Sequence, residues 1–251
     1  MQQTILNELS AMEDAKNVRV LLSIESGSRS WGFASEDSDY DVRYVYIRPM
    51  REYLRLEKTR DTIEWRLDDE LDIVGWDITK FLQLMRSSNP TVYEWLGSPI
   101  VYREDPCFAS VRSVAHSCFN PVACAHHYLG MARKHSFRHI SSGRPTLKRY
   151  LYAMRATLAC KWSIQRQSPI PIPFDKLREA LLEPELMPLV NELLEAKSSS
   201  HEADSFGQIP ELDAWLEENL TALERNVAGI KAPAKVAWST LDDTFAELLD
   251  L

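Results

Sequence analysis

The chain has 251 residues, of which 45% are hydrophobic and 26% charged, and its formal net charge is −8. This composition is that of an ordinary soluble globular protein. No apolar run approaches the roughly 20 residues of a membrane-spanning helix, and the four cysteines lack the CxxC spacing of a metal site. No secretory signal is visible near residue 1, so we expect a cytoplasmic protein without a membrane partner.

Charge is distributed unevenly along the chain. Residues 106–174 contain no Asp or Glu, but they carry ten Lys or Arg residues and five of the six histidines. Solvated surfaces usually mix both signs, so this acid-free block indicates an anionic ligand that faces it. A basic surface formed by chance is the alternative.

The first part of the chain alternates helix and strand signals. Ile5, Leu6, Leu9 and Met12 fall on one helical face, and Asp68-Asp69 joins two strands as a tight hairpin. In chain order, the spacing predicts a helix at 2–16, strands at 18–24, 41–47, 62–67 and 70–76, and helices at 78–88 and 91–96.

From about residue 107 the strand signals mostly vanish. The predicted elements are helices at 124–140, 146–166, 174–182, 186–197 and 212–230, loops at 141–145 and 198–207, and a proline-stiffened connector at 168–174. The pattern predicts an α+β protein, in which a mixed sheet with flanking helices at residues 1–105 precedes an all-helical domain at 106–251.

The stretch GSRSWGFASEDSDYD at residues 27–41 is the strongest local signal. Asp39 and Asp41 lie two apart at the start of a strand, so both carboxylates project the same way and repel unless a cation intervenes. A hard divalent ion such as Mg²⁺ takes such oxygen ligands. Asp72 on a separate strand is the favoured third carboxylate. Asp77 is the alternative, although it fits the N-cap of the following helix.

Gly27 and Ser28 come before these acids, and ten residues lie between Ser28 and Asp39. Because Gly27 lacks a Cβ, a phosphate can approach its backbone closely, and Ser28 adds a hydroxyl and an amide donor. Their place between a strand and a short helical turn suits an anion. Phosphates held there and bridged by metal to the acids form the layout of phosphoryl or nucleotidyl transfer.

These residues resemble the signature of the DNA polymerase beta-like nucleotidyltransferase superfamily, in which a strand, Gly-Ser, a spacer and Asp-x-Asp precede a third acid on a later strand. The resemblance extends over roughly residues 20–165 to the RNA repair pathway-associated nucleotidyltransferases. The positions similar to that family's pattern are Asp72, Lys80-Phe81, Asn89-Pro90, Glu94-Trp95-Leu96, and Lys148, Tyr152 and Arg155.

The resemblance implies transfer of a nucleoside monophosphate from a nucleoside triphosphate to a hydroxyl acceptor, with release of pyrophosphate. Mg²⁺ or Mn²⁺ would be held by Asp39, Asp41 and Asp72. The acceptor could be RNA or protein, and a general base separate from the metal ligands is not identified, although Asp72 could serve.

The helix at 146–166 carries Lys148, Tyr152 and Arg155 at i, i+4 and i+7, on one face. A lysine and an arginine there could stabilise the triphosphate and the leaving pyrophosphate, while Tyr152 stacks on a base. A solvated basic stripe with Tyr152 covering the core is the alternative. The nearby histidines lack the HExxH pattern, and their segment has no acid, so we do not expect zinc.

Two other functions compete with transfer. One is a non-catalytic nucleotide-binding or toxin–antitoxin-type regulatory module on the same scaffold, which would have no need of all three acids. The other is a metal-dependent phosphohydrolase, which would release orthophosphate rather than pyrophosphate. The superfamily's layout serves many acceptors, so these motifs do not choose the substrate.

Overall fold

The computed structural model describes residues 1–35, 37–68, 70–142, 146–199 and 207–250. It contains two compact units: Met1–Ser30, Asp39–Phe119 and Ala234–Leu251 form the first, and Trp31–Ser38 and Asn120–Pro233 form the second. The expected domains at 1–105 and 106–251 stay a prediction, because compactness by itself does not test which stretches fold or act independently.

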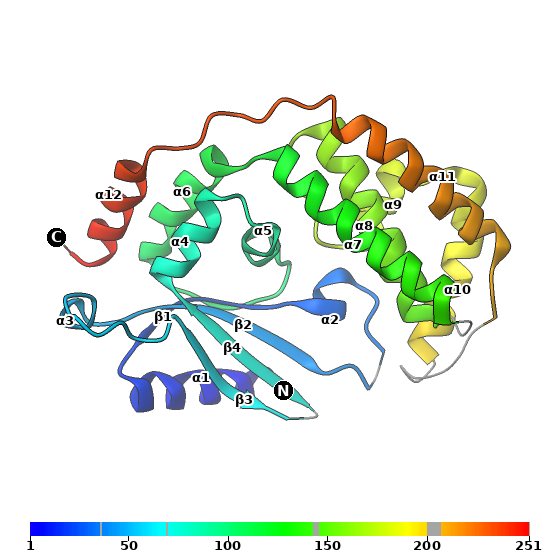
Figure 1. The fold of residues 1–251 in the computed structure, drawn as a ribbon. Coiled ribbons are helices and arrows are strands. Elements are labelled where there is room, and N and C mark those ends of the chain that lie inside the picture. The colour runs from blue at the N-terminus through cyan, green and yellow to red at the C-terminus, as the bar shows by residue number, and fades with distance from the viewer. Residues whose placement is uncertain (36, 69, 143–145, 200–206, 251) are drawn as a thin grey trace. The chain divides into compact units, whose positions relative to one another are not determined.

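The first unit is built on a five-stranded mixed sheet (Figure 1). Its strands are β1 (Arg19–Glu25), β2 (Tyr40–Ile47), β3 (Thr62–Leu67), β4 (Leu71–Asp77) and β5 (Val101–Glu104), in the order β3-β4-β2-β1-β5. The pairs β1–β2, β1–β5 and β3–β4 are antiparallel, whereas β2–β4 is parallel. The prediction of an α+β protein with a mixed sheet is confirmed.

Helices flank both faces of this sheet. Figure 1 shows α1 on one face and α4 and α6 on the other. The helices are α1 (Gln2–Lys16), α2 (Gly27–Trp31), α3 (Met50–Tyr53), α4 (Ile78–Arg86), α5 (Pro90–Gly97), α6 (Ala109–Cys118) and α12 (Trp238–Leu248), with a 3₁₀ turn at Pro106–Phe108. The last of these, α12, packs on α4 and α6.

One hydrophobic core lies between α1 and the sheet. Ile5, Leu9 and Met12 are fully buried there, in a cluster that also contains Tyr44 of β2. Their i, i+4, i+7 spacing places them on a single helical face, as the sequence predicted. Tyr44 stands opposite Gly75 in the parallel register of β2 and β4, where the missing Cβ leaves room for the tyrosine ring.

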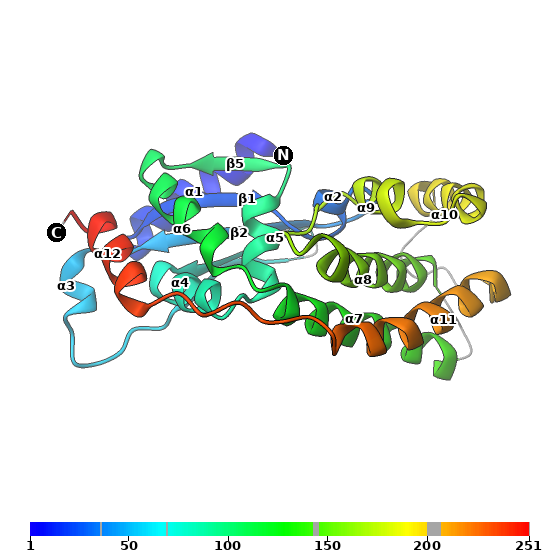
Figure 2. The ribbon, with the colours of Figure 1, turned by 90° about the horizontal axis from the view of Figure 1, so that it is seen from above.

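The described part of the second unit is helical. Its elements are α7 (Pro121–Ser142), α8 (Leu147–Arg166), α9 (Phe174–Leu181), α10 (Met187–Ser199) and α11 (Pro210–Val227), with a 3₁₀ turn at Pro184–Leu186. The long helix α8 contacts α7, α9, α10 and α11, and Figure 2 shows α7, α8 and α11 as neighbouring helices. The predicted helical second half is therefore confirmed over the described residues.

Three helices and one strand of the structure are absent from the sequence prediction: α3, α6, α12 and β5. β5 has only four residues, and it forms by pairing with β1, a partner about 80 residues earlier in the chain. Within the predicted loop at 141–145, residues 141–142 end α7 and the others lie outside the described residues, as does most of the loop at 198–207. No helix in the described ranges combines the length and apolarity that crossing a bilayer requires.

Replacing Gly75 by alanine tests the fit of Tyr44. A Cβ at this position would lie 2.1 Å from Cε2 of the Tyr44 ring, so we expect Gly75→Ala to lower the free energy of unfolding by about 1–3 kcal/mol. Gly130→Ala is the matched control, because nothing lies within 4 Å of the added Cβ and alanine is the better helix former. Chemical denaturation measures both, and equal stability of the two variants would contradict the prediction.

Candidate functional site

Two of the predicted acids lie side by side on parallel strands. Asp41 of β2 is the register partner of Asp72 of β4. Arg43, two residues after Asp41, lies between them: its Nη2 donates to Asp41 Oδ1 at 2.8 Å and to Asp72 Oδ2 at 2.7 Å. Its Nη1 also donates to the backbone oxygen of Asp72 at 2.9 Å. All three side chains are about three-quarters or more buried, at 26%, 20% and 19% exposure for Asp41, Asp72 and Arg43.

Asp72 of this acid pair has one carboxylate oxygen that Arg43 does not reach. Asp72 Oδ1 is buried and accepts no hydrogen bond within the described part of the chain. A buried acceptor left in this state costs free energy unless a cation or a donor reaches it. The donor set therefore fits a hard divalent ion, with Asp41 and Asp72 as ligands.

Asp39 does not join this pair in a complete ligand group. It precedes β2 and is exposed, and its backbone oxygen accepts from Nε of Arg29 at 3.1 Å. Across the ranges that the structure describes, no three His, Cys, Asp or Glu side chains converge as a metal site. The role of Asp39 as a metal ligand stays a prediction.

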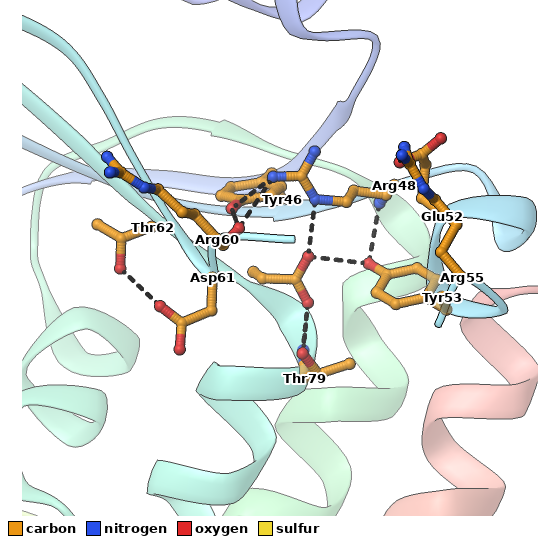
Figure 3. A network of polar contacts seen from close by, with 10 residues as sticks. Tyr46, Arg48, Glu52, Tyr53, Arg55, Arg60, Asp61, Thr62 and Thr79 are labelled. Carbon is orange, nitrogen blue, oxygen red and sulfur yellow. Dashed lines mark hydrogen bonds and ion pairs between the residues drawn. The ribbon is translucent and has the colours of Figure 1, made fainter. Parts of the chain in front are cut away.

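Asp77, the alternative third acid, caps a helix and lies apart from the acid pair. It lies opposite Tyr46, five residues along β4 from Asp72, and is 3% exposed. Its Oδ1 accepts from the backbone N–H of Thr79 at 2.9 Å, which confirms the predicted N-cap of α4. Its Oδ2 accepts from Tyr53 Oη at 3.1 Å and lies 3.5 Å from Arg48 Nε. Figure 3 shows Arg48, Tyr53 and Thr79 in this network.

The Gly27-Ser28 turn touches the acid pair through Asp41. Gly27 has φ +61°, in the left-handed region that glycine occupies without strain. A Cβ built on it would lie 2.1 Å from Asp41 Oδ2, so no larger residue fits here without movement. The preceding Ser26 N–H donates to the backbone oxygen of Asp41 at 2.8 Å. Ser28, at 8% exposure, follows at the start of α2.

Sequence reasoning missed two residues of this site. Arg43 follows Asp41 by two, which places both side chains on one face of the strand. Glu25 ends β1 and is fully buried. Its Oε1 accepts from the backbone N–H of Asp41 at 2.8 Å, and its Oε2 accepts from the hydroxyl of Tyr102. Burial raises the pKa of Glu25. The available signal was a charged residue that ends an apolar strand directly before Ser-Gly-Ser.

The predicted nucleotide-facing residues Lys148, Tyr152 and Arg155 belong to α8 in the second unit. Arg155 is 2% exposed, with its guanidinium carbon 4.1 Å from the ring centroid of Trp31. Tyr152 packs edge-on against the same tryptophan at 4.9 Å between centroids, and Lys148 Nζ lies 5.7 Å from the Tyr152 centroid. At least part of this helical face packs in the core, and the predicted contact of the three residues with a nucleotide stays a prediction.

Gly27→Ala tests whether the close approach to Asp41 requires glycine. A left-handed φ costs a residue with a Cβ about 1–2 kcal/mol, and the overlap with Asp41 adds to it. Gly32→Ala is the matched control, because Gly32 also has positive φ (+86°) but nothing lies within 4 Å of its added Cβ. We expect thermal unfolding to show the larger loss for Gly27→Ala. Equal losses of stability in the two variants would mean that Asp41 Oδ2 can move away from the added Cβ at no cost in free energy.

Arg155→Met tests how far Arg155 supports packing. A desolvated cation–π contact is worth about 2 kcal/mol, so we expect this variant to lower the stability of the second unit by about that amount. Arg166→Met on the same helix is the control, because Arg166 is exposed and its guanidinium lies 5.8 Å from the Trp162 centroid. Thermal unfolding measures both. An Arg155→Met protein of unchanged stability would show that packing does not require this guanidinium.

Comparison with known proteins agrees with the resemblance of the motifs. A family model described as the RNA repair pathway DNA polymerase beta family matches residues 1–247. The chain is also 37% identical to the "Uncharacterized protein YcgL" of Bacillus subtilis (strain 168) over 246 residues, which covers 96% of this chain and 94% of that protein. The chain therefore belongs to the RNA repair pathway DNA polymerase beta family.

Proposed function

We propose that this member of the RNA repair pathway DNA polymerase beta family is a metal-dependent nucleotidyltransferase. The observation that carries the proposal is the pairing of Asp41 with Asp72 beside the Gly27 turn, with Asp72 Oδ1 buried and without a hydrogen-bond donor among the described residues. The family's description supports this type of chemistry. A cytoplasmic location is part of the proposal.

In the proposed reaction, the hydroxyl oxygen of the acceptor forms a bond to the α-phosphorus of a nucleoside triphosphate. The bond from that phosphorus to the bridging oxygen breaks, and pyrophosphate leaves. The hydroxyl proton passes to the carboxylate of Asp72, which Arg43 orients through its Oδ2. The guanidinium keeps both carboxylates at fixed positions, which limits the reorganisation that the reaction requires.

Asp41 and Asp72 would hold Mg²⁺ or Mn²⁺, with Asp39 as the third ligand. When bound, the ion supplies positive charge to the triphosphate oxygens and favours ionisation of the acceptor hydroxyl. Gly27 and Ser28 would receive the phosphates through the hydroxyl and amide donors of Ser28, next to the Asp41 carboxylate that fills the space beside Gly27. Lys148, Tyr152 and Arg155 complete the proposed nucleotide-binding set.

RNA is the acceptor that we favour. The family's description names an RNA repair pathway, and the acid-free block at residues 106–174 carries the positive charge that a polyanion would contact. A protein hydroxyl is the other acceptor to test.

One observation favours a second candidate, a nucleotide-binding module without catalysis. Arg43 already bridges Asp41 and Asp72, and no three-carboxylate metal group forms within the described ranges. A protein that uses this guanidinium in place of a metal would bind a nucleotide without transferring it.

Label transfer separates the two functions. The protein is incubated with each α-labelled nucleoside triphosphate, Mg²⁺ or Mn²⁺, and pooled RNA and protein acceptors. We expect label on RNA, loss of label with a chelator, and a decrease of at least about 100-fold for Asp41→Asn and Asp72→Asn. Asp61→Asn is the control, since Asp61 is more exposed and pairs with Lys80 at 3.0 Å.

The outcomes discriminate clearly. Label on protein alone would keep transfer but replace the acceptor. No label, with triphosphate binding that survives both substitutions at the acid pair, would support the binding module. Release of orthophosphate without label on an acceptor would indicate a phosphohydrolase.

A further inference from the structure

Glu25 is a buried acid within the first unit that the proposed chemistry does not use directly. Its exposure is 0%, and both carboxyl oxygens have partners: the backbone N–H of Asp41 at 2.8 Å and the hydroxyl of Tyr102. Its backbone is held as well, because its N–H donates to the oxygen of Ile100 at 2.9 Å and its own oxygen accepts from Ser98 Oγ at 2.6 Å.

These contacts join three strands at one place. Glu25 ends β1, Asp41 lies in β2, and Tyr102 lies in β5. Burying a carboxyl group costs free energy that an apolar side chain would not, and the preceding residue Ile24 shows that β1 accommodates apolar residues. The buried carboxyl group is therefore best explained by what it holds, which is the backbone of Asp41.

The position of that backbone matters for the acid pair. The Asp41 carboxylate lies beside Asp72 and also fills the space beside Gly27, where its Oδ2 would be 2.1 Å from an added Cβ. A small shift of the Asp41 backbone would change both distances. Misplacement of a reacting group by about 1 Å can cost about 100-fold in rate.

We propose that Glu25, supported by Tyr102, is a positioning residue that fixes the backbone of Asp41 and so aims its carboxylate toward Asp72. Glu25 holds the Asp41 N–H whether or not the protein transfers a nucleotide. Its catalytic consequence rests on the proposed nucleotidyl transfer.

Hydrogen exchange at the Asp41 amide tests the structural part without any activity. Losing one hydrogen bond of roughly 1.4 kcal/mol corresponds to about tenfold faster exchange, and we expect this in Glu25→Leu. Glu25→Gln keeps a side-chain oxygen for the Asp41 N–H and should preserve the slow exchange. Tyr102→Phe frees one carboxyl oxygen and should give an intermediate rate. Ser23→Ala is the matched control, because Ser23 Oγ is buried on the same strand and has no hydrogen-bond partner in the described part of the chain.

Steady-state kinetics test the catalytic part. We expect Glu25→Leu to lower kcat about tenfold or more while KM for the triphosphate changes by less than about twofold, and Glu25→Gln to restore kcat. If the wild type transfers no label, the proposed function fails, and the exchange rates still decide whether Glu25 holds Asp41. If Glu25→Leu does not fold, Tyr102→Phe replaces it in both measurements.

Two results would overturn the proposal. The first is Asp41 exchange that is equal in the wild type, Tyr102→Phe and every folded Glu25 variant. The second is a loss in kcat that Glu25→Gln does not restore although its Asp41 amide stays protected, because Glu25 would then act through its charge and not through the position of Asp41.

Discussion

The parallel pairing of β2 with β4 places two carboxylates next to each other, and the surrounding structure depends on this constraint. Side-by-side acids repel, and each resists burial. Arg43 relieves part of that repulsion by donating to both. The guanidinium is planar and presents several donors at fixed angles, so it orients the acids as well as neutralising charge. A lysine at this position could supply the charge but not the same bridging geometry.

Two further residues, Gly27 and Glu25, fix the position of Asp41. Gly27 provides space that a side chain would fill, and Glu25 provides an acceptor for the Asp41 N–H. These two residues lie only two apart in the sequence, on either side of Ser26. A single short stretch, Glu25–Gly27, thus determines both where the backbone of Asp41 lies near the start of β2 and what can approach its carboxylate. The short edge strand β5 contributes one residue to this arrangement, Tyr102, whose hydroxyl donates to Glu25.

Much of this arrangement follows from local sequence patterns. Alternation along 41–47 and 70–76 predicts the strands, the apolar positions of residues 2–16 predict α1, and the motif picks out Gly27, Asp41 and Asp72. What could not be predicted depends on partners distant in the chain. Arg43 is predictable as a neighbour of Asp41, but its bridge to Asp72 requires the parallel register. Glu25 reads as the polar end of a strand until β5 supplies Tyr102.

Helix α8, which carries Lys148, Tyr152 and Arg155, shows a different limit of prediction from the sequence. A spacing of i, i+4, i+7 places three side chains on one face, yet it does not say whether that face meets solvent, ligand or core. For Arg155 the decisive contact is Trp31, more than 120 residues earlier in the chain. A pattern of residue types cannot distinguish a cation that serves a ligand from one that covers an aromatic ring.

The division of the motif between the two units has a consequence for biosynthesis. The spacer Trp31–Ser38 belongs to the helical unit, while the turn before it and the acids after it belong to the sheet unit. The sheet unit also contains Ala234–Leu251, from the end of the chain. On the ribosome, α12 is therefore made only after the whole helical unit, although it packs on α4 and α6. The sheet unit is therefore complete only after more than a hundred further residues have been synthesised, and until then α12 does not cover α4 and α6.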